Sequence, residues 1–286
     1  MPLAHFAQRA ARSVVQLCSS LVALSACLAG CAGPVPEQEE GVVSTSEAVE
    51  GVNGLAMNGL AMNGLVKNGL AMNGLTANGL TANGLMRTSA ISAALNGDPL
   101  AQMFMQYVVS CALPTGQNVV LTTPAGQPSY TFTGGLGVAP EWGAGDRASC
   151  DATCQQWVSA CVISRVNALG QHVALSERGN NPALALVAGE AAFYPNREAT
   201  YFGNVFLAPQ ELYGCRSAGD DQTLIGRVCG DGADVSGCLV TVADPCQSRC
   251  GPRRADGSYA ECATANGSFM PAVTVYRLST STSANM

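Results

Sequence analysis

Histidine and carboxylate side chains supply the acid and base groups that this chain could use in catalysis. Only His172 lies beyond the N-terminal segment, so a mechanism that pairs a histidine with a serine or cysteine nucleophile has to use it. The sequence contains neither a G-x-S-x-G nor an H-E-x-x-H pattern. Glycoside hydrolysis needs two carboxylates instead, and the candidates are Glu177, Glu190, Glu198 and Glu211. A secreted hydrolase that uses such a pair, or His172, stays open as the alternative function, and no residue is assigned as catalytic.

Cysteine gives the strongest chemical signal in the sequence. The chain has 13 cysteines, of which Cys18, Cys27 and Cys31 lie in the N-terminal segment, leaving ten. An even number in an exported protein predicts a disulfide framework, in which each bridge stabilises the fold by about 2–4 kcal/mol. Zinc sites favour C-x2-C spacings with histidine or further cysteine pairs, whereas this chain has C-x3-C spacings, so we expect no metal and no cofactor. The predicted disulfide cysteines are Cys111, Cys150, Cys154, Cys161, Cys215, Cys229, Cys238, Cys246, Cys250 and Cys262.

The segment Leu28-Ala29-Gly30-Cys31 has the form of a lipoprotein processing site. A short basic segment and an apolar run from Val14 to Leu28 precede it, as in an export signal. We therefore predict a signal peptide at residues 1–30 and lipidation of Cys31, with palmitate or related acyl chains binding the protein to the membrane. An uncleaved membrane anchor is the alternative, but the apolar run is shorter than the roughly 20 residues that span a bilayer.

Compartment and charge limit the class of partner. In Gram-negative lipoproteins, which this segment resembles, a residue other than Asp after the lipidated cysteine usually implies the outer membrane, and Ala32 stands here. Loss of the signal peptide leaves 12 basic side chains against 20 acidic ones, a net charge near −8. Nucleic-acid binding depends on lysine and arginine contacts to phosphate. We therefore expect an extracytoplasmic, lipid-anchored protein with no nucleic-acid partner.

Two stretches of unusual composition separate this anchor from the rest of the chain. Residues 31–52 contain five glutamates and few apolar side chains, which is typical of a solvated, disordered tether. Residues 53–87 are seven pentads of the form Asn-Gly-Leu-x-x. Because Asn-Gly readily adopts positive φ, the pattern predicts a turn every five residues.

The regular leucines of these pentads loosely resemble the pentapeptide-repeat family, in which a central Leu or Phe points inward at each corner of a square β-solenoid. That resemblance implies a short solenoid, or turns that lean on the following domain. A flexible tether is the other interpretation, because seven pentads make fewer than two coils and solenoids need about three repeating units. With one aliphatic side chain in each pentad, we expect deletion of Asn53 to Arg87 to leave the following domain folded.

Residues 88–286 predict a single disulfide-rich domain of the α+β class, with two main helices and short antiparallel strands. Asp98-Pro99 is typical of a helix start, and the helix should end near Leu113. Ser149 could cap a second helix running to about Leu169. Three cysteines lie on one face of that helix, so each is expected to bridge to a different neighbour. Strands are predicted at residues 118–122, 129–133, 171–178 and 273–278.

Aromatic residues gather between residues 193 and 213. They could form a surface on which a ligand stacks, and the alternative is ordinary core packing, which aromatic side chains dominate. The candidate binding surface consists of Trp142, Tyr194, Tyr201 and Phe202.

The order of lipid site, acidic tether, Asn-Gly-Leu pentads and cysteine-rich domain is similar to that of predicted surface lipoproteins of myxobacterial type. The resemblance implies a location and no activity. We therefore expect a lipid-anchored cell-envelope protein that acts as a non-enzymatic surface binding or structural module. Its expected partners are the membrane, through the lipid, and another envelope protein or a glycan.

Overall fold

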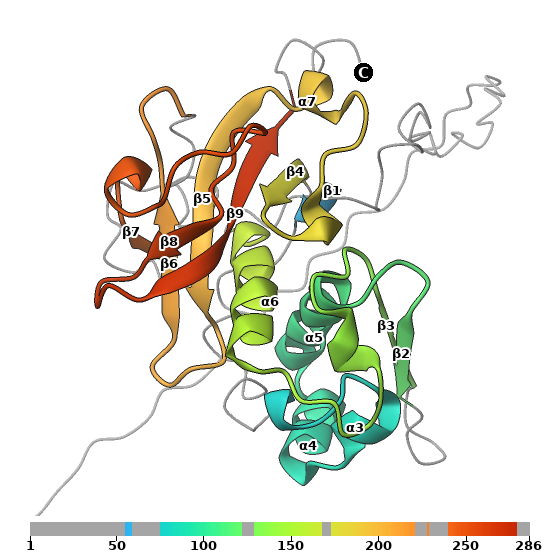
Figure 1. The fold of residues 1–286 in the computed structure, drawn as a ribbon. Coiled ribbons are helices and arrows are strands. Elements are labelled where there is room, and N and C mark those ends of the chain that lie inside the picture. Colours follow the sequence, from blue (N-terminus) through green and yellow to red (C-terminus); the bar gives the residue numbers. More distant parts are fainter. Residues whose placement is uncertain are drawn as a thin grey trace, which may run out of the picture. The chain divides into compact units, whose positions relative to one another are not determined.

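The computed structural model describes residues 55–58, 75–121, 129–167, 173–220, 228 and 240–278, all within one compact unit, Ser44–Met286 (Figure 1). The signal peptide, Cys31, the whole tether, His172, Cys229 and Cys238 lie outside the described residues. The helices are η1 (Leu75–Ala77), α3 (Ala82–Met86), α4 (Ser89–Gly97), α5 (Pro99–Ala112), η2 (Pro140–Gly143), α6 (Ala152–Ser164), η3 (Pro182–Leu184), α7 (Glu190–Phe193) and η6 (Cys246–Ser248). The strands are β1 (Leu55–Asn58), β2 (Asn118–Leu121), β3 (Tyr130–Thr133), β4 (Val173–Gly179), β5 (Asn196–Asn204), β6 (Glu211–Cys215), β7 (Thr241–Val242), β8 (Glu261–Ala263) and β9 (Phe269–Arg277).

A seven-stranded sheet organises the fold, in the order β1-β4-β9-β5-β6-β7, with β8 pairing beside β9. Its strands pair antiparallel, except that β6 and β7 run parallel. A separate hairpin of β2 and β3 lies beside α5. The described residues thus mix helices and strands, and the predicted α+β class is confirmed.

Helix α6 packs on one face of this sheet, across β5 and β9, and α5 packs against α6 (Figure 1). Alternate residues of the strands supply the sheet's share of this core, including Leu175, Tyr201 and Val273, all fully buried. The loop between η6 and β8 contributes Tyr259 to the opposite face, where Phe202 and Ala272 meet it. The central strands are therefore buried on both faces, and each face can be considered as a separate environment.

Helix α5 begins and ends where the sequence predicts. Asp98 caps it by accepting a hydrogen bond from the Leu100 amide at 2.9 Å, and Pro99 occupies the first turn. The helix ends at Ala112, before Leu113 and Pro114. Its buried face includes Phe104 and Val108, as the helical spacing predicts.

Helix α6 is shorter than predicted at both ends. Asp151, and not Ser149, caps it, by accepting a hydrogen bond from the Cys154 amide at 2.9 Å. Cys150 is drawn away from the helix because its amide donates to the Thr76 carbonyl at 2.9 Å. The helix ends at Ser164, next to the cap residue Arg165.

The last pentads pack against the domain that the sequence predicts to begin at Thr88. Leu75, Leu80 and Leu85 are each only 1% exposed and lie in the same core cluster as α5 and α6. The Trp142 indole donates to the Asn78 carbonyl at 2.8 Å, and the Leu80 amide donates to the Trp142 carbonyl at 2.8 Å. Of the two alternatives for the pentads, residues 75–87 follow the one in which they lean on the following domain.

The two described glycines of the pentads, Gly79 and Gly84, serve close packing and do not adopt the positive φ that the Asn-Gly pattern predicts. A Cβ added to Gly79 would lie 1.7 Å from the Gly145 carbonyl oxygen, and one added to Gly84 would lie 2.1 Å from the Gly79 carbonyl oxygen. The start of the repeat contributes differently, since Leu55–Asn58, the end of the first pentad and the first residue of the second, form the edge strand β1 beside β4. Residues 59–74, between these two parts, lie outside the described residues. Among the described helices, none is long and apolar enough to cross a membrane.

Candidate functional site

A polar row crosses the sheet on the face opposite α6. Ser176 on β4 and Arg197 on β5 both pair with Tyr276 on β9, so the three side chains point to the same side. One step along, Thr274 lies between Arg178 and Thr200, and the two threonine hydroxyls are 2.9 Å apart. Strand alternation alone therefore places two arginines and a tyrosine on one surface of the sheet.

Arg178 is the most densely bonded side chain of this row. Its guanidinium lies 3.5 Å above the centre of the Tyr276 ring, donates to the Tyr194 carbonyl at 2.8 Å and donates to the Ser176 hydroxyl at 3.0 Å. Burial lowers the pKa of Arg178, and Tyr276, Glu190 and Asp256 offset part of this shift. The Arg178 cation is thus fixed over the face of the Tyr276 ring.

Glu190 compensates this buried cation from helix α7. The Ser176 hydroxyl donates to one of its carboxylate oxygens at 2.6 Å, and the Val187 amide donates to the other at 3.1 Å. The carboxylate is fully buried. Both oxygens are therefore engaged in holding the short helix against β4.

Arg197 and Asp220 form an ion pair at the rim of the row. The Ser217 amide donates to the second carboxylate oxygen of Asp220 at 2.6 Å. Burial alone would lower the pKa of Arg197, but the hydrogen bond and the negative charge of Asp220 outweigh it and raise the pKa above its ordinary value. Arg197 therefore stays charged across the physiological pH range.

A depression of about 450 Å³ opens beside this pair, and this is the candidate binding site. It is lined by Pro195, Asn196, Arg197, Gly219, Asp220 and Tyr276. Hydrogen-bond donors, acceptors and one aromatic ring thus meet in a small volume. Such a set can hold a polar ligand that carries several hydroxyl groups, because fixed polar groups orient such ligands.

Two of the glutamates predicted as a candidate carboxylate pair lie on opposite faces of the sheet. Glu177 faces α6, where Arg165 pairs with it at 3.0 Å and the Ser164 hydroxyl donates to it. Glu190 bonds Ser176, the neighbouring residue of β4, on the other face. These two cannot flank one bond of a substrate.

The remaining candidates for acid–base chemistry are divided between strands. Glu198 is fully buried at the bulge of β5, and Glu211 is half-buried at the start of β6. His172 lies outside the described residues, so its predicted role stays a prediction.

Four disulfides lie within the described residues, and they confirm that this is a disulfide-bonded chain. The bridges are Cys111–Cys161, Cys150–Cys154, Cys215–Cys246 and Cys250–Cys262. The expectation that each cysteine of α6 bridges to a different neighbour is wrong for one pair. Cys150 precedes the helix, so it can reach Cys154 in the first turn, whereas Cys161 bridges to α5.

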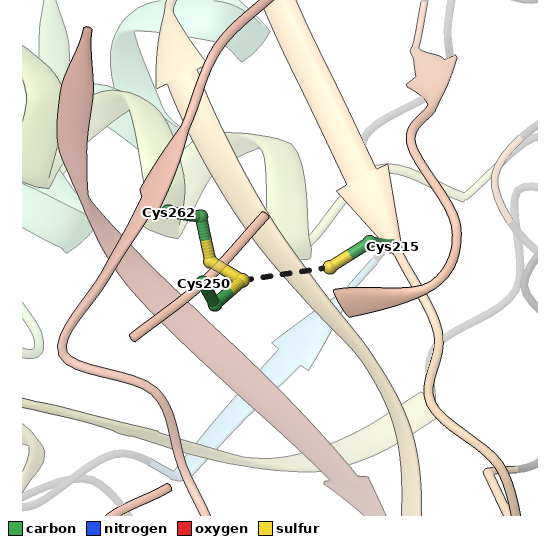
Figure 2. Close-up of side chains that lie close together, drawn as sticks. All are labelled: Cys215, Cys250 and Cys262. Atoms are coloured by element: carbon green, nitrogen blue, oxygen red, sulfur yellow. Dashed lines mark hydrogen bonds between the residues drawn. A yellow bond between two sulfur atoms is a disulfide. The ribbon is translucent and has the colours of Figure 1, made fainter. Parts of the chain in front are cut away.

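Two of these bridges touch. Figure 2 shows the Cys250 sulfur between the sulfurs of Cys262, to which it is bonded, and Cys215, which lies 3.8 Å away. The sulfurs of Cys215, Cys250 and Cys262 all lie within 4.8 Å of one another, a spacing that could suit a metal ion. Zinc binds thiolates, and here the sulfurs are bonded in disulfides.

The predicted aromatic surface does not form. Trp142 is 1% exposed, Tyr194 6%, and Tyr201 and Phe202 are fully buried. Tyr201 lies in the core beneath α6, Phe202 lies on the opposite face, and Trp142 packs edge-on against Phe206. These side chains are part of the core, which was the alternative interpretation.

Sequence reasoning missed Arg178, Arg197, Asp220 and Tyr276, the residues that make up the polar row and its rim. They come from three strands and a loop, separated by up to 98 positions in the chain. The strand that carries Tyr276 was predicted, but its pairing with β5 was not. Only the register of β4, β9 and β5 brings these residues together.

Comparison with known proteins finds one match. Residues 59–86 match the family model described as GLTT repeat, in six copies. No curated protein and no solved structure matches the chain. The match covers a short part of the chain, and it shows that this is a repeat-containing protein, similar in that stretch to other GLTT repeats.

Proposed function

We propose that this chain is a lipid-anchored protein of the outer membrane, and that its folded unit acts as a non-enzymatic binding module. The lipoprotein site ending at Cys31 supports the anchor. The disulfides of the described residues support an oxidising compartment, where such bridges form and persist.

The depression beside Arg197 is the single observation that carries the binding function. Its charged groups are held by partners within the protein, since Asp220 binds both Arg197 and the Ser217 amide. Both carboxylate oxygens of Asp220 are therefore fixed in place, and they hold the Arg197 guanidinium beside the depression. The ligand class that fits is a glycan, whose hydroxyl groups can accept from Arg197, the more exposed member of the ion pair.

The acidic tether provides reach in this proposal. Residues 31–52 link the lipid to the folded unit, and a flexible chain of this length has a root-mean-square span of about 25 Å. The last pentads add no reach, because residues 75–87 are packed into the core.

Membrane fractionation tests the anchor. The variant Cys31→Ser should move the protein from the membrane fraction to the soluble extracytoplasmic fraction. The variant Cys27→Ser is the matched control, because it changes a cysteine of the same segment four residues earlier and should leave the protein with the membrane. Sedimentation of Cys31→Ser with membranes would defeat the lipoprotein proposal.

Glycan binding tests the depression. The full chain is titrated with envelope glycans, and Tyr276→Phe, which removes one hydroxyl from the lining, should weaken binding while the protein stays folded. Tyr213→Phe is the control, because Tyr213 stacks on Phe202 at a ring distance of 5.2 Å and does not line the depression. Equal affinities of the two variants and the natural chain would reject this site.

A further inference from the structure

Cys250 differs from the other sulfurs of its cluster in its access to solvent. Cys215, Cys246 and Cys262 are fully buried, whereas Cys250 is half-buried. It lines an opening of about 500 Å³, distinct from the depression beside Arg197. The opening is lined by Gln247, Cys250, Gly251, Pro252, Arg253 and Tyr259. A reagent from solvent therefore reaches the Cys250–Cys262 bridge at one of its two sulfurs.

Arg253 gives this opening a positive edge. The side chain is exposed, and its Nε donates to the Tyr259 hydroxyl at 2.9 Å, which holds the guanidinium beside the opening. Arg249 is also exposed, directly before Cys250 in the chain. Reactive cysteines characteristically lie in electropositive, partly exposed surroundings, and positive charge also attracts the thiolate anion that attacks a disulfide.

We propose that Cys250 is the reactive sulfur of a thiol–disulfide exchange site that accepts an anionic thiol at this opening. The incoming thiolate attacks the Cys250 sulfur and forms a mixed disulfide with it. The Cys250–Cys262 bond breaks, and its electron pair leaves on the Cys262 sulfur as a thiolate. One disulfide and one thiolate are present before and after the step, so no external oxidant or reductant is needed.

The contact with Cys215 gives the exchange a second route. The sulfurs of Cys215 and Cys250 lie 3.8 Å apart and belong to different bridges. Neither carries a proton, so they are in van der Waals contact with no atom between them. A second thiolate can attack the outer sulfur of the mixed disulfide, which forms a disulfide between the two incoming thiols and releases Cys250 as a thiolate. The Cys250 thiolate can then attack Cys215, and Cys246 leaves as the new thiolate. The arrangement in Figure 2 thus lets a bridge pass from one disulfide to its neighbour.

The first test uses reduced glutathione as the probe on the full chain, followed by alkylation and peptide mapping. Glutathione should appear on Cys250 and the alkyl label on Cys262, while the buried pair Cys111–Cys161 stays intact. The bridge to Cys154 is the matched control, because Cys154 is also half-buried but belongs to no sulfur cluster among the described residues. Reaction at Cys154 equal to that at Cys250, or no adduct on Cys250, would overturn the proposal.

Charge and source of the thiol are tested next. Arg253→Glu should slow the reaction with anionic glutathione and speed the reaction with cationic cysteamine. Arg253→Lys keeps the positive charge, so glutathione should still react faster than cysteamine, as it should in the natural chain. A second arm replaces glutathione with a folded protein that has one cysteine on an acidic surface. Reaction with glutathione alone assigns the site to small thiols, and reaction with both extends it to protein thiols. An unchanged order of rates in Arg253→Glu would contradict the role of this opening.

The passage of the bridge to Cys215 is tested with Cys262→Ser. This variant leaves a thiol on Cys250 beside Cys215, so the alkyl label should divide between Cys250 and Cys246. Cys150→Ser is the control, in which the label should stay on Cys154. Label confined to Cys250 in a variant that retains the circular dichroism spectrum of the natural chain would refute the second route.

Discussion

The two faces of the sheet are stabilised in different ways. On the α6 face, helices α5 and α6, the last pentads and the strands share one large apolar core. On the opposite face, the buried apolar residues fall into two small groups, one around Tyr259 and one of Tyr194 with Tyr276. That face also holds two touching disulfides and the polar row of Arg178. The α6 side has two disulfides and the Arg165–Glu177 ion pair as well, but there they add to a large apolar core. Where apolar contact is limited, covalent bridges and fixed ion pairs maintain the fold.

The difference also separates stability from chemistry. On the α6 face, the ion pair of Arg165 and Glu177 is buried. Both openings described above lie on the opposite face, next to Tyr276 and Tyr259. A face built from cross-links can leave polar and sulfur atoms near solvent without losing its shape. The substitutions below test this comparison by removing one element at a time.

The largest loss should follow Arg165→Met on the α6 face. Arg165 is the partner of Glu177, and both side chains are almost fully buried, at 4% and 0% exposure. Removing one partner leaves a buried carboxylate without its cation, which costs about 3–5 kcal/mol. Urea denaturation of the variant gives the free energy of unfolding. The double variant Arg165→Met with Glu177→Met should recover most of the loss, and a double variant as unstable as the single one would argue against this account.

On the opposite face, the matching test removes the Cys215–Cys246 bridge by changing both cysteines to serine. The bridge closes a loop across 31 positions, and its loss should cost about 4 kcal/mol by loop-closure entropy. Cys150–Cys154 spans only 4 positions, so the corresponding double variant should lose about 2 kcal/mol. Thermal unfolding under non-reducing conditions ranks the two. Equal losses would mean that chain entropy does not set the contribution of these bridges.

Local signals in the sequence predicted the elements well. Asp98 followed by Pro99 located α5, and the alternation around Leu175 located β4, because caps and side-chain periodicity act over a few residues. The disulfide character followed from the even cysteine count. The pairing of the cysteines did not follow from the sequence. Cys150 can bond Cys154 only because it lies outside the helix, and its position there depends on the tertiary hydrogen bond to Thr76.

Long-range packing was beyond these signals. One leucine in every five residues gives no amphipathic face, so nothing in the repeat indicates that Leu80 is buried under Trp142. The polar row could not be predicted for the same reason, since Arg197 and Tyr276 are brought together only by the register of β5 and β9. The aromatic residues between 193 and 213 allow two interpretations, a binding surface or core packing, because composition does not show what covers each face of a strand. Tyr201 and Phe202 lie on opposite faces of β5, and both faces are buried.

The contribution of the pentads to the α6-side core is tested by Leu80→Ala. Leu80 is 1% exposed, and truncation of a buried leucine should cost about 3 kcal/mol. Met86→Ala is the control, since Met86 is 42% exposed and its loss should have little effect. For the same reason, deletion of Asn53 to Arg87 should now unfold or strongly destabilise the unit, contrary to the expectation from sequence. An unchanged melting temperature in Leu80→Ala would mean that the pentads do not stabilise the core and would favour the interpretation of a flexible tether.

The smallest effect should come from the ion pair between Arg216 and Asp244, on the disulfide-linked side of the sheet. The guanidinium lies 2.6 Å from the carboxylate, but the side chains are 18% and 32% exposed, so water screens their attraction. Arg216→Gln should therefore cost less than about 1 kcal/mol, and the cost should shrink further at about 1 M salt, where charges are screened within about 3 Å. Asp244→Ala should cost more, because this carboxylate also accepts a hydrogen bond from the Arg216 amide at 2.5 Å. Chemical denaturation at low and high salt separates the two contributions. If Arg216→Gln were as damaging as Arg165→Met, the distinction between a sealed face and a cross-linked face would fail, because exposed and buried ion pairs would contribute alike.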